Sequence, residues 1–259
     1  MTAAIIQISD QFWNIRGEFK VGGLIDIGTH TSLVRRENDE FVLLDAYTLS
    51  DDVKIQVDEL TEGGAKLAAI INLHPFHTVH TQRAHEQYPN ASLYGTRRHL
   101  ELFPNLPWQR ELTESEQFQT LFAPDFEFSI PAGVDFISRN EHLHFASVLA
   151  YHKASKTIHS DDTLMYLRLP GLLGKLKPPQ VTFHMTLART LQKRAGAAAE
   201  FRTWAEQLIA RWHDAENLCA AHSACLLAAD RSSHSIAQSI EAALKKVDKT
   251  LSAHARKYG

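Results

Sequence analysis

The pattern of apolar and polar positions in the first hundred residues predicts short strands that alternate with helices. Apolar residues recur at helical spacing between Val53 and Leu60, and the pattern stops at Gly63, a residue type that suits a helix end. A polar run before Pro89 predicts a second helix over 81–88. Apolar or β-branched runs between turn residues predict strands over 13–21, 31–36, 41–44, 67–73 and 92–95. This alternation favours an α/β layered fold.

The second half of the chain is predicted to continue with short strands and to end in helices. An apolar run over 218–229 is interpreted as a buried strand, and further strands are expected over 134–137, 144–151, 157–158 and 164–167. Helical spacing predicts one or two helices over 186–214 and a long amphipathic helix near the end. We therefore expect one domain over residues 1–259, with a helical insertion at about 171–215 and a C-terminal helix at about 235–258.

Composition and charge disfavour several classes of protein. A chain of 259 residues, 44% of them hydrophobic, can bury a full core, and a formal net charge of −3 gives no broad basic surface for nucleic acid. The first ten residues lack the basic and apolar regions of a signal peptide, which predicts a cytoplasmic protein. The run over 218–229 is shorter than the roughly 18 residues of a membrane span, so no membrane association is expected. Cys219 and Cys225 fit neither a CxxC pair nor a zinc knuckle and are interpreted as buried free thiols.

Three histidines stand at three-residue intervals directly after the predicted strand over 67–73. They are His74, His77 and His80, in a segment with the sequence H-P-F-H-T-V-H. Neutral imidazole is the commonest protein ligand of first-row metals, and an α/β protein usually carries its chemistry at strand ends. The sequence therefore predicts a metal site on this loop, and the competing interpretation is a set of exposed loop histidines.

Further candidate ligands follow downstream. Asp161 and Asp162 come after an apolar strand, where a carboxylate would complete a metal site; taken alone, a turn or a helix cap is the simpler interpretation. His142 and His144 alternate as on a strand, so both would point to one face and either one is a candidate. His222 lies inside an apolar run, where it is either a ligand or a hydrogen-bonded core histidine.

In the order of these residues the chain resembles the metallo-β-lactamase superfamily over most of residues 12–230. The family has a strand that ends in aspartate, as Val42-Leu43-Leu44-Asp45 does here, and then a histidine loop of the form H-x-H-x-D-H. A later histidine, a bridging aspartate and a last histidine follow in the family. The counterparts in this sequence are His74, His77, His80, His144 (or His142), Asp162 and His222. The resemblance implies an α/β fold, the four-layer αβ/βα sandwich, with metal held at the rim between two sheets.

The resemblance also implies a role for each residue. His74, His77 and His144 hold a first zinc or iron ion, Asp162 bridges or completes it, and a second ion is held by His80 with His222. Asp45 is expected to support the histidine loop by hydrogen bonds from outside the coordination shell. One or two ions would lower the pKa of bound water, and the resulting hydroxide would attack a small ester-like or thioester-like substrate.

The loop departs from the family pattern at its most sensitive position. One residue is inserted between the first two histidines, and Val79 stands where the family carries an aspartate. That aspartate serves the second metal and orients the attacking water, and valine does neither. We therefore expect a weaker second site. The alternative function is a catalytically degenerate member that acts as a binding or scaffolding module.

Other residues have a less specific interpretation. The C-terminal helix either covers its own sheet or joins a second copy, which would make a homo-oligomer. Histidines elsewhere, among them His99 and His159, are interpreted as ordinary, with His152 and His184 expected nearest the site. Four residues of the insertion are candidates to face a small-molecule substrate, with helical core contacts as the simpler interpretation: Phe183, Met185, Leu187 and Trp204.

Overall fold

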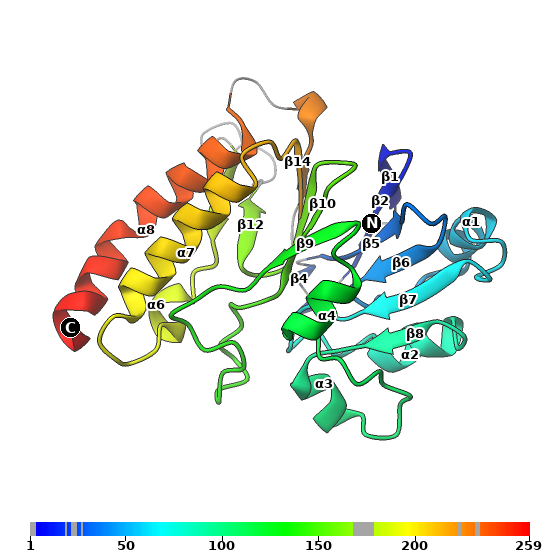
Figure 1. Ribbon diagram of the computed structural model, residues 1–259, viewed down its shortest axis with the longest axis horizontal. Helices are drawn as coiled ribbons and strands as arrows, with labels where there is room; N and C mark the ends of the chain where they lie inside the picture. The colour runs from blue at the N-terminus through cyan, green and yellow to red at the C-terminus, as the bar shows by residue number, and fades with distance from the viewer. Residues whose placement is uncertain are drawn as a thin grey trace. The chain divides into compact units, whose positions relative to one another are not determined.

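The computed structural model describes residues 4–18, 20–21, 25–26, 28–167, 179–221, 224–230 and 234–259 (Figure 1). Contacts group the chain into two compact units. The first unit comprises Met1–Glu127 and His152–Ser155, and the second comprises Phe128–Tyr151 and Lys156–Gly259. The prediction of one domain over the whole chain stays a prediction, and each unit is described by itself.

The first unit is built on a six-stranded sheet with the order β1-β2-β5-β6-β7-β8. The antiparallel half contains β1 (Ala4–Ser9), β2 (Phe12–Gly17), β5 (Thr29–Arg35) and β6 (Phe41–Leu44). The parallel half continues from β6 to β7 (Leu67–Ile71) and β8 (Ser92–Tyr94). A separate ribbon pairs β3 (Lys20–Val21) with β4 (Ile25–Asp26). The helices are α1 (Asp51–Leu60), α2 (Thr81–Gln87), α3 (Arg97–Leu102) and α4 (Glu116–Leu121).

The parallel half of this sheet follows from its apolar sequence. Strand β6 is buried at all four positions, as expected of a parallel strand with both faces covered. Helix α1 connects β6 to β7 and buries Val53 and Val57, one turn apart, in the same core. The helical spacing predicted this helix, which begins two residues earlier than expected because Asp51 and Asp52 extend its first turn, where acidic residues favour the helix dipole.

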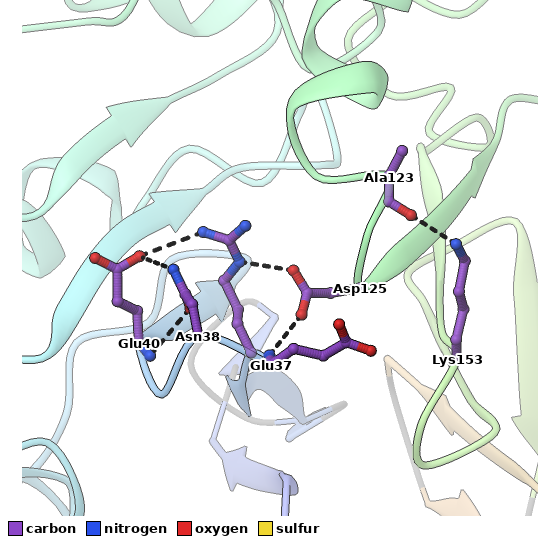
Figure 2. A network of polar contacts seen from close by, with 7 residues as sticks. Glu37, Asn38, Glu40, Ala123, Asp125 and Lys153 are labelled. Atoms are coloured by element: carbon purple, nitrogen blue, oxygen red, sulfur yellow. Dashed lines mark hydrogen bonds and ion pairs between the residues drawn. The ribbon is translucent and has the colours of Figure 1, made fainter.

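A buried carboxylate joins distant parts of the first unit (Figure 2). Asp125 is 4% exposed. Its Oδ2 forms an ion pair with Arg36 Nε at 2.8 Å, and its Oδ1 accepts a hydrogen bond from the Glu37 backbone N–H at 2.7 Å. The backbone N–H of Lys153 donates to the carbonyl of Asp125 at 3.0 Å. This network holds the turn between β5 and β6 against the segment that leads into β9.

The second unit contains a five-stranded sheet with the order β15-β14-β11-β10-β9. Its strands are β9 (Phe126–Ser129), β10 (Leu149–His152), β11 (Thr157–Ser160), β14 (Asn217–Ala220) and β15 (Cys225–Leu226), and the boundary between the units falls inside β9 and β10. A hairpin of β12 (Leu164–Leu167) and β13 (Gln180–Phe183) follows β11. The helices are α6 (Leu187–Thr190), α7 (Ala197–Arg211), α8 (Ile236–Tyr258) and a 3-10 turn, η1 (Ala228–Asp230).

Helix α8 covers the core of its own unit. It packs along α7 and against β13 (Figure 1). A capping box starts the helix: Ser235 accepts from the Gln238 N–H, and the Gln238 side chain accepts from the Ser235 N–H. Its apolar stripe is part of the second core, with Ile236, Ile240, Leu244 and Leu251 all buried. The helix that the sequence predicted over 235–258 therefore buries its apolar face within the chain, while the homo-oligomer stays a prediction.

The predicted strand over 134–137 is wrong, and the one over 144–151 is right only for its last three residues. Val134 forms only an isolated bridge with Leu191, and β10 begins at Leu149 instead of residue 144. The apolar run over 145–148 is buried, but its backbone is held by a side chain: the Ser147 N–H donates to Thr163 Oγ1 at 3.0 Å, and that hydroxyl donates to the Phe145 carbonyl at 2.9 Å. A buried segment outside a sheet and a buried strand have the same run of apolar residues, so the sequence does not distinguish them.

Other boundaries agree more closely. The apolar run over 218–229 forms β14 and β15, and the predicted loop over 171–179 lies almost wholly outside the described residues. Cys219 and Cys225 are buried free thiols, as predicted. In the described part of the chain, no helix has the length and apolar character needed to cross a membrane.

Replacing Asp125 by alanine is expected to destabilise the protein by about 3 kcal/mol, because the largely buried guanidinium of Arg36 loses its buried carboxylate and keeps only the exposed Glu40. The free energy of unfolding in urea measures the loss. Glu40→Ala is the matched control, since Glu40 is an exposed partner of the same arginine, and its cost is expected within about 0.5 kcal/mol. Equal losses for the two variants would contradict the role given to Asp125.

Acid is expected to weaken the fold through His152. The ring lies between Phe12 and Phe126, and burial lowers its pKa to about 4 despite the opposing charge of Asp125. As pH falls, His152 is therefore protonated in the unfolded chain before it is protonated in the folded protein. Its contribution to the free energy of unfolding, about 3 kcal/mol, is complete above pH 6.5 and is lost between about pH 6.5 and 4. Urea unfolding of wild type and His152→Asn over this range tests the assignment. An identical pH dependence for the two proteins, or a His152 imidazole that titrates near pH 6.5 by NMR, would refute it.

Candidate functional site

The histidine loop begins where two parallel strands of the first unit end together. Leu44, the last residue of β6, pairs with Ile71, the last residue of β7, so Asp45 lies beside the start of the loop. Asp45 Oδ1 accepts hydrogen bonds from the backbone N–H groups of Leu73 at 2.7 Å and His74 at 3.3 Å. The residue is 4% exposed and has φ of 61°, a left-handed conformation that aspartate tolerates better than most residues. This carboxylate therefore fixes the first turn of the loop.

Within the loop, His74 and His77 lie against each other. Their rings are stacked with centroids 4.0 Å apart, and their ligand atoms lie within 4.8 Å of one another. His74 is fully buried, and its Nδ1 accepts a hydrogen bond from the Phe76 N–H at 3.1 Å. A metal ion needs an unprotonated nitrogen, so binding through Nε2 of His74 would require the proton to move to Nδ1 and this bond to break.

His80 is oriented differently. It precedes α2, its Nδ1 lies 2.9 Å from Thr48 Oγ1, and its ring packs edge-on against Tyr47 at 4.8 Å between centroids. Its Nε2 is buried and has no hydrogen-bond partner among the described residues. Burial lowers the pKa of His80, and His77 lowers it further. The imidazole is therefore neutral at neutral pH, which is the form that binds a metal.

A fourth imidazole, His99, was interpreted as ordinary from the sequence. It is fully buried, and its Nδ1 lies 2.9 Å from Thr96 Oγ1. Burial lowers the pKa of His99 to about 3 against the opposing effect of a hydrogen bond with the His77 backbone, and the charges of His74 and His77 lower it further. The position of His99 in the sequence could have identified it. Thr96 and His99 follow β8, which is the parallel neighbour of β7, and neighbouring parallel strands end at the same edge of a sheet.

In the second unit, β11 carries a histidine that sequence reasoning also missed. His159 is fully buried on this strand, and its ligand atom lies within 4.8 Å of that of Asp161. Asp161 and Asp162 form the turn after β11, and both are 2% exposed. The alternation of His159 and Asp161 along an extended chain was the signal, because side chains two apart on a strand point to the same face.

The remaining predicted ligands are less favourably arranged. His144 is half-buried and directs Nε2 at the backbone carbonyl of Glu141, while His142 is exposed. The strand that would have put both rings on one face is not formed, so that part of the prediction is wrong. His222 lies outside the described residues. Among the residues that the structure describes, His80 and His144 belong to no group of three ligand atoms close enough to hold a metal.

Comparisons with known proteins identify the fold. No family model matches the chain, and a search of curated proteins finds no relative. Solved structures do match. A metallo-β-lactamase from Pontibacter korlensis is 12% identical, covers 94% of this chain and 99% of its own, and has a TM-score of 0.55. One from Erythrobacter litoralis, with β-mercaptoethanol in its active site, is 16% identical, with coverage of 96% and 97% and a TM-score of 0.60.

FIM-1 from Pseudomonas aeruginosa, solved in a mono-zinc form, is 10% identical, with coverage of 95% and 96% and a TM-score of 0.59. At identities this low the likeness concerns the fold, and it extends over nearly the full length of both chains. The chain therefore has the α/β fold of the metallo-β-lactamases, as the resemblance in its sequence predicted, at sequence identities of 10 to 16% to these three structures.

Proposed function

We propose that this chain is a metal-dependent hydrolase of the metallo-β-lactamase superfamily that acts on a small ester-like or thioester-like substrate. The observation that carries the proposal is the stacked pair of His74 and His77, with ligand atoms within 4.8 Å, on a loop whose first turn is fixed by Asp45. In a chain with this fold, such a loop is the expected place for metal ligands.

The donors of the first unit fit a zinc or iron ion. Imidazole suits both metals, and His80 adds a buried Nε2 with no hydrogen-bond partner among the described residues. A bound ion would act as a Lewis acid and lower the pKa of water to near neutrality. The protein's own contribution is to hold the loop and a neutral imidazole in fixed positions: Asp45 holds the loop backbone, and Thr48 holds the His80 ring.

The other members of the ligand set are proposed from the resemblance in the sequence. We assign Asp162 as the bridging or completing carboxylate, His144 to the first ion, and His222 with His80 to the second. Asp162 is 2% exposed, and a buried carboxylate is stabilised when it coordinates a metal. Using His144 requires its Nε2 to leave the Glu141 carbonyl. His159 and Asp161 form a further pair of donors on the same strand and turn.

Met185 is the best candidate to contact the substrate among the four residues of the insertion. Phe183, Leu187 and Trp204 are 5%, 2% and 7% exposed and pack in the second core, as the simpler interpretation expected, whereas Met185 is 88% exposed. Phe183 pairs with Leu164, which follows the Asp161–Asp162 turn by two residues. The segment after Phe183 is therefore at the same end of the hairpin as that turn, where an exposed thioether would bind an apolar part of a substrate.

Two observations favour the alternative, a binding or scaffolding module without turnover. Val79 is 70% exposed at the position of the family aspartate, and the Nε2 of His144 is already hydrogen-bonded. Hydrolysis of a short thioester distinguishes the two functions. Turnover that a chelator abolishes and zinc restores supports the enzyme, whereas metal binding without turnover supports the module.

Protein purified without chelator is expected to contain zinc or iron, and His77→Ala is expected to lose most of it, because this change removes half of the stacked pair. Elemental analysis after gel filtration measures the content. His213→Ala, which removes an exposed histidine of the second unit, is the control and should keep the wild-type content. A wild-type protein that holds no metal would rule out the proposed function.

Val79→Asp is expected to lower the dissociation constant of the second ion at least roughly 10-fold, because it adds a carboxylate between His77 and His80. Partners outside the coordination shell already change metal affinity by about this factor, and a carboxylate ligand should change it no less. Competition with a chromophoric chelator measures both dissociation constants. Val79 is 70% exposed, so the change should cost little stability. Val79→Thr, of the same shape without charge, is the control. Equal second-ion affinity in the two variants would show that the missing carboxylate is not what weakens the site.

A further inference from the structure

The side chain of His80 is held from two sides by consecutive residues of the first unit. Thr48 Oγ1 lies 2.9 Å from Nδ1, and the Tyr47 ring contacts the imidazole edge-on at 4.8 Å between centroids. Both residues belong to the segment that leaves β6, three residues or fewer after Asp45. One short segment therefore contacts the histidine loop at its start, through Asp45, and at its end, through Thr48.

The position of Tyr47 depends on a glycine. A Cβ atom at Gly17, the last residue of β2, would lie 2.1 Å from a ring carbon of Tyr47 and 2.2 Å from its hydroxyl oxygen. Heavy atoms never approach this closely, so only glycine lets the ring lie over the end of β2. The Tyr47 ring that contacts His80 thus occupies space that the glycine at the end of β2 leaves open.

The backbone of His80 is also fixed. The residue precedes α2, and its carbonyl accepts a hydrogen bond from the Ala84 N–H at 2.9 Å. With the backbone, Nδ1 and one ring edge all held, Nε2 is the remaining polar atom, and it is buried without a hydrogen-bond partner in the described part of the chain. A buried ring nitrogen in this state is unfavourable, and a ligand at Nε2 would remove that cost.

We propose that Thr48 is a positioning residue for His80: its hydroxyl oxygen accepts a hydrogen bond from Nδ1–H, which leaves the lone pair on Nε2 to bind a metal ion. The inference rests on the proposed function. It gives the second ion a prearranged ligand in spite of Val79. Histidine ligands commonly donate their other ring N–H to an oxygen, which fixes the tautomer and makes the ligating nitrogen more basic.

His74 and His99 set this arrangement apart. In His74, Nδ1 accepts a backbone N–H, which favours the opposite tautomer. In His99, Nδ1 faces Thr96 Oγ1 at 2.9 Å and Nε2 is buried, as in His80, but the ring is not in the predicted ligand set. The matched control is the pair of Ser155 and His152 in the same unit: Ser155 Oγ lies 2.8 Å from Nδ1 of the buried His152, which is not in the predicted ligand set.

The experiment compares the full-length wild type with Thr48→Val, Thr48→Ser and the control Ser155→Ala. In metal-free protein, long-range ¹H–¹⁵N spectra of the imidazoles report which nitrogen of His80 carries the proton. We expect Nδ1–H in wild type and Thr48→Ser, and a shift toward Nε2–H in Thr48→Val, which keeps the shape and loses the acceptor. Zinc competition titrations on the same proteins should show one binding step weakened roughly 10- to 100-fold in Thr48→Val only.

The outcomes separate this inference from the proposed function. A wild type that binds zinc, with Thr48→Val indistinguishable from it in both affinity and tautomer, overturns the inference and leaves the function standing. An Nε2–H tautomer in metal-free wild type also overturns it. Equal weakening in Ser155→Ala and Thr48→Val shows a general loss of packing and refutes the specific role. A wild type that binds no zinc overturns the proposed function itself.

Discussion

The hydrogen bonds between the segment that leaves β6 and the histidine loop are the constraint on which the rest of the site depends. Asp45 holds the backbone at the start of the loop, Thr48 holds the side chain at its end, and the backbone of Leu49 makes two hydrogen bonds with the side chain of Gln87 in α2. The loop carries no regular structure of its own between β7 and α2. Without these bonds its imidazoles would have no fixed geometry to offer a metal ion.

This anchoring gives the histidines of the loop fixed positions although the loop departs from the metallo-β-lactamase pattern. The family pattern places three imidazoles and a carboxylate on one loop, whereas this chain has an inserted residue and the exposed Val79. The insertion does not separate His74 from His77, because the loop turns back through the His74 carbonyl and the two rings stack. No other residue of the loop supplies the missing carboxylate. Under the proposed function, His80 is therefore the ligand that the loop provides to the second ion.

Much of the fold was predictable from the sequence, and the reasons are local. Val53 and Val57 predicted α1 because a buried helix face repeats every three to four residues, and the stripe of α8 did the same. The strand over 144–151 was partly wrong because residues 145–148 are buried by the core and held by Thr163, which no periodicity reveals. His99 and His159 were missed because their place beside other donors depends on which strands end together. The histidine loop was found because its three histidines lie within seven residues of the sequence.

The central claim is that imidazoles of this loop bind a metal ion, and the X-ray absorption spectrum of the metal-loaded protein tests it most directly. The account predicts nitrogen or oxygen neighbours at about 2.0–2.1 Å, with the outer-shell scattering of at least two imidazoles, for a zinc-loaded sample. The imidazole scattering should diminish in His77→Ala. A metal ion surrounded only by oxygen atoms, with no imidazole signature and no change in that variant, would contradict the account.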